Sequence, residues 1–158
     1  RTVSLKLPRP TAGAMDNGVH LYPLRVYYEE TDAGRMVYHA AYLKFAERAR
    51  TEMMRVNGLD HIEMIEKYGL VFAVRSAEIQ YLKQAKLEDE LLVQTCVASL
   101  GGASMVMDQK INFISDAGLG VLVAEVKIKL VTVNEAGRPQ RLPDYIKTAI
   151  ERLRDEKG

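Results

Sequence analysis

One carboxylate, Asp32, lies where the chain is expected to pass from a strand into a helix. Residues 25–28 are mostly β-branched or aromatic, which favours a strand, and good helix formers follow Ala40. Gly34 is expected to supply a turn between the two elements. The first N–H groups of a helix lack backbone partners and, together with the helix dipole, favour negative charge. A carboxylate beside them could attack or activate water while those N–H groups hold a developing oxyanion.

An ordinary structural role competes with this catalytic one. Aspartate is common in loops that precede helices, where its side chain accepts hydrogen bonds from nearby backbone N–H groups. Judged by its position alone, Asp32 is better explained by such a turn. The residues around Asp32 favour the catalytic role over the turn role, because together they form a recognisable pattern.

The sequence around Asp32 resembles the signature of the 4-hydroxybenzoyl-CoA thioesterase family. The shared pattern, matched without a gap over residues 30–42, is an Asp, a Gly two positions later, an apolar–aromatic–His run and a further aromatic residue. The likeness continues over residues 44–52 and extends from about residue 22 to about residue 143. Within the family, the chain is most similar to bacterial acyl-CoA thioesterases associated with the Tol–Pal system, which are hotdog-fold proteins. Arg35 and Met36 depart from the smaller or apolar residues often found at their positions.

The resemblance implies an enzyme that hydrolyses the thioester bond of an acyl-CoA to a free acid and CoA. Thioester hydrolysis needs donors aimed at the carbonyl oxygen, and a base or nucleophile. In the family the aspartate that matches Asp32 carries the chemistry, either by activating water or by attacking the carbonyl, and both routes stay open. His39 matches the position next to the acid, where it would donate to the oxyanion, orient Asp32 or tune its pKa. The N–H groups of Tyr38, His39 and Ala40 are expected to polarise the carbonyl.

Substrate contacts are expected from the same motif, although core packing explains its tyrosines equally well. The candidates are Gly34, Val37, Tyr38 and Tyr42. No separate cofactor is expected, because coenzyme A enters as part of the substrate. No metal is expected either, because no second histidine stands at a ligand spacing from His61. An adaptable pocket for an alkyl chain, or ordinary core filling, is expected from four methionines: Met53, Met54, Met105 and Met107.

The resemblance also implies an assembly of identical chains. Hotdog relatives build their sites across a dimer interface, so a homodimer or homotetramer with the active site between subunits is expected. Residues 71–77 are the expected pairing edge, because dimerisation removes the liability of an uncovered strand edge. Four basic residues are available either for the CoA phosphates or as surface charge: Arg75, Lys83, Lys86 and Arg138.

Two other functions stay open on the same fold. One is a hotdog module that binds acyl groups or acyl carrier protein with little catalysis. The other is a hydratase or dehydratase, whose relatives usually place the carboxylate on or beside the central helix. Glu47 lies on that helix, but a salt bridge to Arg50 or Lys44 is the favoured interpretation of this residue.

The composition excludes several classes of function. The 158 residues include 22 basic and 21 acidic ones, so the basic excess that would indicate nucleic acid or an anionic membrane is missing. No apolar run approaches the ~20 residues that span a bilayer, and the N-terminal residues lack the apolar core of a signal peptide. Cys96 is the single cysteine, which excludes an internal disulfide and suits a reducing cytosol. We therefore expect a cytoplasmic protein.

The periodicity predicts a single α+β domain. Residues 1–19 are expected to form a flexible extension, and residues 20–158 a hotdog domain with a C-terminal helix from residue 143. Residues 40–56 are predicted to be helical, with one apolar stripe: Tyr42, Ala46, Ala49, Met53 and Val56. An irregular helical segment is expected over 59–69, and strands over 21–29, 71–82, 91–100, 104–115 and 121–133. This order predicts a long antiparallel sheet wrapped around the helix over residues 40–56.

Overall fold

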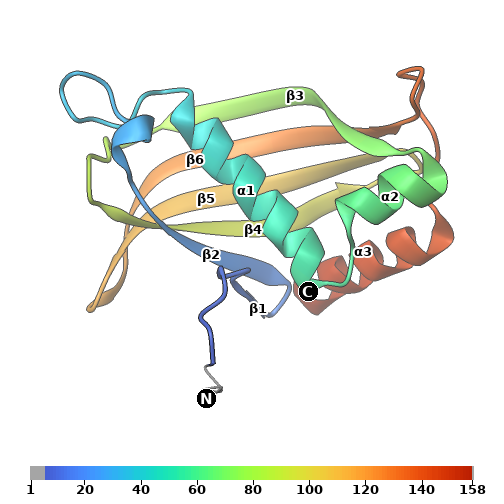
Figure 1. Cartoon of the computed structure of the whole chain (residues 1–158), viewed down its shortest axis with the longest axis horizontal. Helices are drawn as coiled ribbons and strands as arrows, with labels where there is room; N and C mark the ends of the chain where they lie inside the picture. Colours follow the sequence, from blue (N-terminus) through green and yellow to red (C-terminus); the bar gives the residue numbers. More distant parts are fainter. Residues whose placement is uncertain (1–5, 158) are drawn as a thin grey trace, which may run out of the picture.

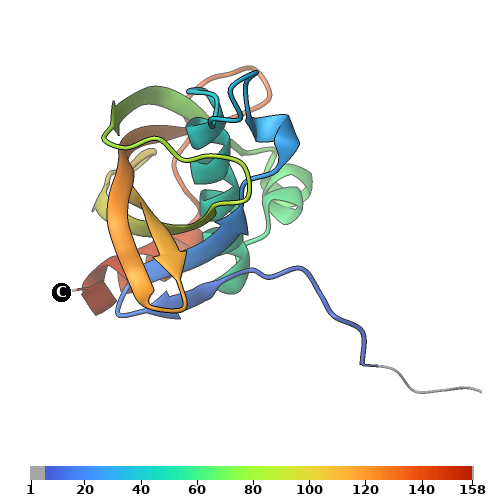
Figure 2. The same cartoon turned by 90° about the vertical axis from the view of Figure 1, so that its left-hand side faces the viewer.

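A six-stranded antiparallel sheet curves around one long helix (Figure 1). The computed structural model describes residues 6–157. The strands are β1 (Ala14–Asp16), β2 (Val19–Arg25), β3 (Val71–Tyr81), β4 (Glu90–Leu100), β5 (Ser104–Ser115) and β6 (Gly118–Val133). The helices are α1 (Ala41–Val56), α2 (His61–Tyr68) and α3 (Asp144–Lys157), with a 3₁₀ turn, η1, over Tyr28–Glu30. The strand order is β1-β2-β4-β5-β6-β3, and Figure 2 shows the sheet curling around α1, which confirms the predicted α+β hotdog architecture.

The apolar stripe of α1 forms the centre of the core. Ala46, Ala49 and Met53 are buried against the sheet, and Phe45, one residue before Ala46, is fully buried as well. The two alanines let the sheet approach the helix closely, because they carry no side chain beyond Cβ. Val56 departs from the predicted stripe, since it is 39% exposed. It is the last residue of α1, where the chain turns away.

The first long strand ends earlier than predicted. β2 stops at Arg25, and residues 28–30 form η1 instead of continuing the strand to Glu29. Glu30 explains the difference, because its N–H donates to the carbonyl of Tyr27 (3.1 Å) and its carboxylate accepts from the N–H of Tyr27 (3.0 Å). These two local bonds close a turn that the strand propensity of residues 26–28 does not indicate.

A short hairpin precedes the predicted domain boundary. β1 pairs with β2 through Met15 and His20, and the turn between the strands is formed by Asn17 and Gly18. Both turn residues have positive φ angles, 48° and 77°, as a tight hairpin that matches the twist of its strands requires. The extension predicted over residues 1–19 therefore includes a paired strand, which is too short to show periodicity. Residues 1–5 of that extension lie outside the described part of the chain.

Strand β3 forms one edge of the sheet. It is paired with β6 along its length, and its other side carries no strand within residues 6–157. Val71, Val74 and Tyr81 on this strand are each more than two-fifths exposed. The predicted bounds of β3, β4 and β5 agree with the structure to within one residue. The structure thus places an uncovered, partly apolar edge where the sequence predicts the pairing edge.

Candidate active site

The loop between η1 and α1 leads directly into the central helix (Figure 1). The Asp32 side chain holds this loop in shape. Its Oδ1 accepts hydrogen bonds from the N–H groups of Gly34 (2.9 Å) and Met36 (3.2 Å). The Asp32 backbone closes the same turn, because its N–H donates to Met36 (2.9 Å) and its carbonyl accepts from Arg35 (3.0 Å). The turn role that competes with catalysis for Asp32 is therefore present in the fold.

The unusual backbone conformation in this loop belongs to Arg35 and not to Gly34. Arg35 has a φ of 62°, in the left-handed region that non-glycine residues rarely adopt. The backbone of Gly34 lies outside that region, so glycine is not needed there for its φ angle. A Cβ at Gly34 would lie 3.4 Å from Oδ1 of Asp32. Glycine at this position therefore leaves space beside the carboxylate.

The second carboxylate oxygen of Asp32 stays available. Asp32 is exposed, and Oδ2 makes no hydrogen bond with another residue in the described range. The N–H groups that anchor this side chain belong to the loop, so the first N–H groups of the helix are left for the role expected of them, which is to hold an oxyanion. An aspartate with one oxygen anchored and the other facing outward is positioned to act on a bound molecule.

Two of the three predicted oxyanion donors remain free. The N–H of Tyr38 donates to the carbonyl of Glu30 (2.8 Å) and cannot serve a ligand. The N–H groups of His39 and Ala40 donate to no acceptor within residues 6–157. The carbonyl of His39 accepts from the hydroxyl of Tyr81 (2.8 Å), which fixes this peptide beside the end of β3. The start of α1 thus keeps two donors near the Asp32 loop.

Two buried residues, Val37 and Tyr42, connect the Asp32 loop to Ala85 by hydrogen bonds. The N–H of Val37 donates to the carbonyl of Ala85 (2.9 Å), and the N–H of Ala85 donates to the hydroxyl oxygen of Tyr42 (3.1 Å). Tyr42 is only 3% exposed, and burial raises the pKa of its hydroxyl, so the group stays protonated. This is the packing role that the sequence left open for Tyr42. Tyr38, by contrast, is 51% exposed, and its ring lies 4.4 Å from the ring of His39.

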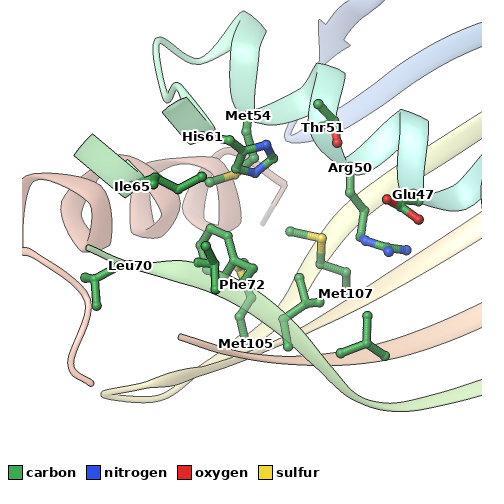
Figure 3. A pocket seen from close by; sticks show the side chains of 13 residues that line it. Glu47, Arg50, Thr51, Met54, His61, Ile65, Leu70, Phe72, Met105 and Met107 are labelled. Atoms are coloured by element: carbon green, nitrogen blue, oxygen red, sulfur yellow. The ribbon is translucent and has the colours of Figure 1, made fainter. Parts of the chain in front are cut away.

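A cavity of about 340 Å³ lies between α1, α2 and the first half of β3, away from the Asp32 loop of the same chain (Figure 3). Its walls are mainly apolar and include Met54, Met105 and Met107, three of the four methionines for which the sequence left an adaptable pocket and ordinary core filling open. All four methionines, Met53 included, are buried in one core cluster, which is the core filling that the sequence left open beside the pocket. Val71 and Val74 line this cavity and are also exposed on the edge strand β3, so the cavity extends to that edge.

Arg50 is the residue of this cavity that sequence reasoning missed. It is 8% exposed, and its Nη1 donates to Oε1 of Gln109 (3.0 Å). Gln109 in turn donates to the carbonyl of Ala46 (2.9 Å) and to the hydroxyl of Thr95 (3.0 Å). Burial lowers the pKa of Arg50, and the charge of Glu47 opposes that effect. No ion pair links Glu47 to Arg50 or Lys44 in the described part of the chain, so the expected salt bridge is not formed.

Comparison with known proteins assigns the family. The family model described as "Thioesterase-like superfamily" matches residues 26–150. The chain belongs to the thioesterase-like superfamily. The acyl-CoA thioesterase YbgC of Haemophilus influenzae is 39% identical over 140 residues, which cover 89% of this chain and 99% of that protein. The acyl-CoA thioester hydrolase YbgC of Escherichia coli O157:H7 is 37% identical over 133 residues, which cover 84% and 96%.

Solved structures of proteins described as thioesterases share the fold. A probable thioesterase from Bartonella henselae superposes with a TM-score of 0.72 at 33% identity, covering 79% of this chain and 99% of that one. A 4-hydroxybenzoyl CoA thioesterase mutant in complex with 4-hydroxybenzoyl CoA superposes with a TM-score of 0.78, covering 84% and 99%. At 17% identity, this second likeness shows the fold alone.

The motif of this thioesterase-like chain is thus divided into two layers. The exposed layer carries Asp32, Gly34, Tyr38 and His39, and the buried layer carries Val37 and Tyr42. Among residues 6–157, no helix is long and apolar enough to cross a membrane. The signal that could have revealed Arg50 is its place on α1, four residues after the buried Ala46 and one after the buried Ala49.

Proposed function

We propose that this chain hydrolyses acyl-CoA thioesters, with Asp32 as general base or nucleophile. The observation that carries the proposal is an Asp32 anchored through Oδ1, whose Oδ2 forms no hydrogen bond within residues 6–157, as is also true of the N–H groups of His39 and Ala40 at the start of α1. The relatives named as acyl-CoA thioesterases cover most of the chain. Two N–H groups aimed at a thioester oxygen would stabilise the tetrahedral intermediate that hydrolysis requires.

Both routes give the same products. In the base route, water transfers a proton to Asp32 and attacks the carbonyl carbon, and the intermediate then expels the CoA thiolate, which regains that proton. In the nucleophile route, Oδ2 attacks the carbonyl and expels the thiolate, and water cleaves the resulting anhydride. Each route consumes one water and releases a carboxylic acid and CoA. His39 is exposed beside the loop, and we assign it a positioning role next to the acid.

The complete site is proposed to lie between two chains. The edge of β3 that carries no strand within residues 6–157 can pair with β3 of a second copy. The two strands would run antiparallel, because a two-fold interface brings the same element of both chains together. Pairing about Ser76, the middle of β3, would place Val71 of one chain opposite Tyr81 of the other. Val71 lines the cavity and Tyr81 holds the His39 peptide. The acid loop of one chain would then reach the cavity of its neighbour.

The first experiment replaces the acid. Asp32→Asn keeps an oxygen for the loop N–H groups but removes the base, and we expect kcat/KM on a panel of acyl-CoAs to fall at least about 100-fold. Asp116→Asn, in the exposed turn after β5, is the matched control and should retain full activity. Equal rates for Asp32→Asn and the wild type on every acyl-CoA would overturn the assignment. Hydration of an enoyl-CoA without hydrolysis would replace it with the hydratase function.

The second experiment tests the shared site. Thr51→Trp fills the cavity from a half-buried wall position and should abolish turnover by itself. Differently tagged Asp32→Asn and Thr51→Trp chains are co-expressed, and the mixed dimer is purified through both tags. Because one of its two sites then combines an intact acid loop with an intact cavity, the mixed dimer should show about half of the wild-type activity. An inactive mixed dimer would place acid and cavity in the same chain.

A further inference from the structure

The cavity beneath α1 combines apolar walls with one buried positive charge. Met105, Met107 and Leu130 contribute apolar side chains from the sheet. Arg50 reaches into the same space from α1, with Glu47 beside it (Figure 3). A cavity of about 340 Å³ is at the small end of the range for ligand sites, which is about 300–1,000 Å³. This combination would suit a short chain that ends in a polar group.

The guanidinium of Arg50 has donors to spare. It carries five N–H donors, and one hydrogen bond is formed, from Nη1 to Gln109. The fully buried side-chain atoms without partners, among residues 6–157, belong to His20, Glu30 and Thr132 and not to Arg50. The unbonded N–H groups of Arg50 are therefore not sealed in the core, and they open onto the cavity that this residue lines.

The charge of Arg50 also lacks a direct counter-ion. Its hydrogen-bond partner, Gln109, is neutral, and Gln109 is itself committed to Ala46 and Thr95. Glu47 is exposed at the cavity rim and forms no ion pair with Arg50 within the described residues. A buried cation gains most from a carboxylate, since the planar guanidinium can bind both oxygens at once. The cavity therefore favours an anionic group beside Arg50.

Resting on the proposed thioesterase function, we infer that the cavity takes the acyl chain and that Arg50 binds a carboxylate at its far end. The preferred substrates are then short ω-carboxyacyl-CoAs, that is, half-thioesters of dicarboxylic acids. The apolar methionines contact the methylene groups between the thioester and the carboxylate. Arg50 thus selects the substrate, and it takes no part in bond cleavage.

The test compares three acyl groups of equal chain length, which are adipoyl-, hexanoyl- and 6-hydroxyhexanoyl-CoA. For the wild type, kcat/KM should be about 10- to 100-fold higher for adipoyl-CoA than for hexanoyl-CoA, the range expected for charge-assisted hydrogen bonds. Arg50→Met should lower kcat/KM for adipoyl-CoA to about the value that the same variant shows for hexanoyl-CoA, mainly through KM. Arg55→Met, an exposed arginine on the same helix, is the control and should keep the wild-type preference.

The outcomes separate this inference from the proposed function. Hydrolysis of hexanoyl-CoA without any preference for adipoyl-CoA by the wild type would overturn the role of Arg50 and leave the thioesterase function intact. A preference for 6-hydroxyhexanoyl-CoA over adipoyl-CoA would also overturn it, because the far end would then bind a neutral group. Failure to cleave any acyl-CoA would instead remove the proposed function. The wild-type comparison decides the matter even if Arg50→Met fails to fold.

Discussion

The hydroxyl of Tyr42 holds the Asp32 loop through Ala85 and Val37, so removing this hydroxyl tests whether these contacts stabilise the loop. In Tyr42→Phe the ring and its edge contacts with Phe45 and Tyr81 are kept, with centroids at 6.0 and 5.6 Å in the wild type. The change deletes the acceptor for the N–H of Ala85. Ala85 is fully buried, so water cannot replace the lost oxygen without a rearrangement.

The expected magnitude follows from this burial. Leaving a buried N–H without a partner costs about 1–3 kcal/mol of the free energy of unfolding. For a chain of this size, each kcal/mol shifts the melting temperature by roughly 2–4 °C, so Tyr42→Phe should melt about 2–12 °C below the wild type. Because the carbonyl of Ala85 also holds Val37, the loop should loosen and kcat should fall as well.

The assay is thermal unfolding followed by circular dichroism, together with acyl-CoA hydrolysis. Tyr28→Phe removes a hydroxyl from a ring that is 74% exposed and should change stability by less than about 0.5 kcal/mol, which makes it the matched control. If Tyr42→Phe melts with the control and the wild type, the bond between Tyr42 and Ala85 does not stabilise the loop. The buried residues of the motif, Val37 and Tyr42, would then not support its exposed residues.

Three further changes have defined outcomes. Burial raises the pKa of Glu30 above its ordinary 4.5, and neighbouring Glu29 adds to the shift. The stability that the protonated group contributes is therefore present below pH 4.5 and is lost as the pH rises through the raised pKa. The melting temperature of Glu30→Gln relative to the wild type should rise with pH across this window, and a constant difference would refute the shift. Tyr81→Phe removes the donor to the carbonyl of His39 and should lower kcat by about 3- to 10-fold with little change in melting temperature, whereas unchanged kcat would show that this peptide needs no such anchor. Val74→Lys adds a charge to the exposed edge of β3 and should shift the population to monomers in light scattering, unless another surface forms the dimer.

The sequence predicted best what depends on periodicity. The stripe on α1 and the alternating strands β3 to β5 follow directly from repeating burial, so their bounds were correct to within a residue or two. The loop was harder, because its shape depends on single hydrogen bonds. Nothing in the sequence indicates that Arg35, and not Gly34, adopts the left-handed conformation, or that Glu30 ends the strand by bonding to Tyr27.

The cavity was only partly predictable for a related reason. Three methionines at alternating or helical positions indicate an apolar space, and Met54, Met105 and Met107 do line it. The sequence named Arg50 only as one of two salt-bridge partners for Glu47, although its place on α1 next to the buried Ala49 is a signal of burial. Its hydrogen-bond partner could not be predicted, because Gln109 stands 59 positions away in the sequence on β5. Such a pairing depends on strand register, which a single sequence specifies weakly.

The two roles of Asp32 can be separated by two substitutions at the same position. Asn at position 32 retains an Oδ1 acceptor for Gly34 and Met36, whereas Ala removes that acceptor as well as the acid. Both variants should lose activity to a similar extent, but only Asp32→Ala should also lose about 1–2 kcal/mol of stability, because two exposed hydrogen bonds of modest net worth disappear. Equal melting temperatures of Asp32→Asn and Asp32→Ala would show that Oδ1 does not organise the loop. Oδ1 closes the turn and Oδ2 is the oxygen to which we assign the chemistry, so the loop that presents the proposed acid is shaped by that same side chain.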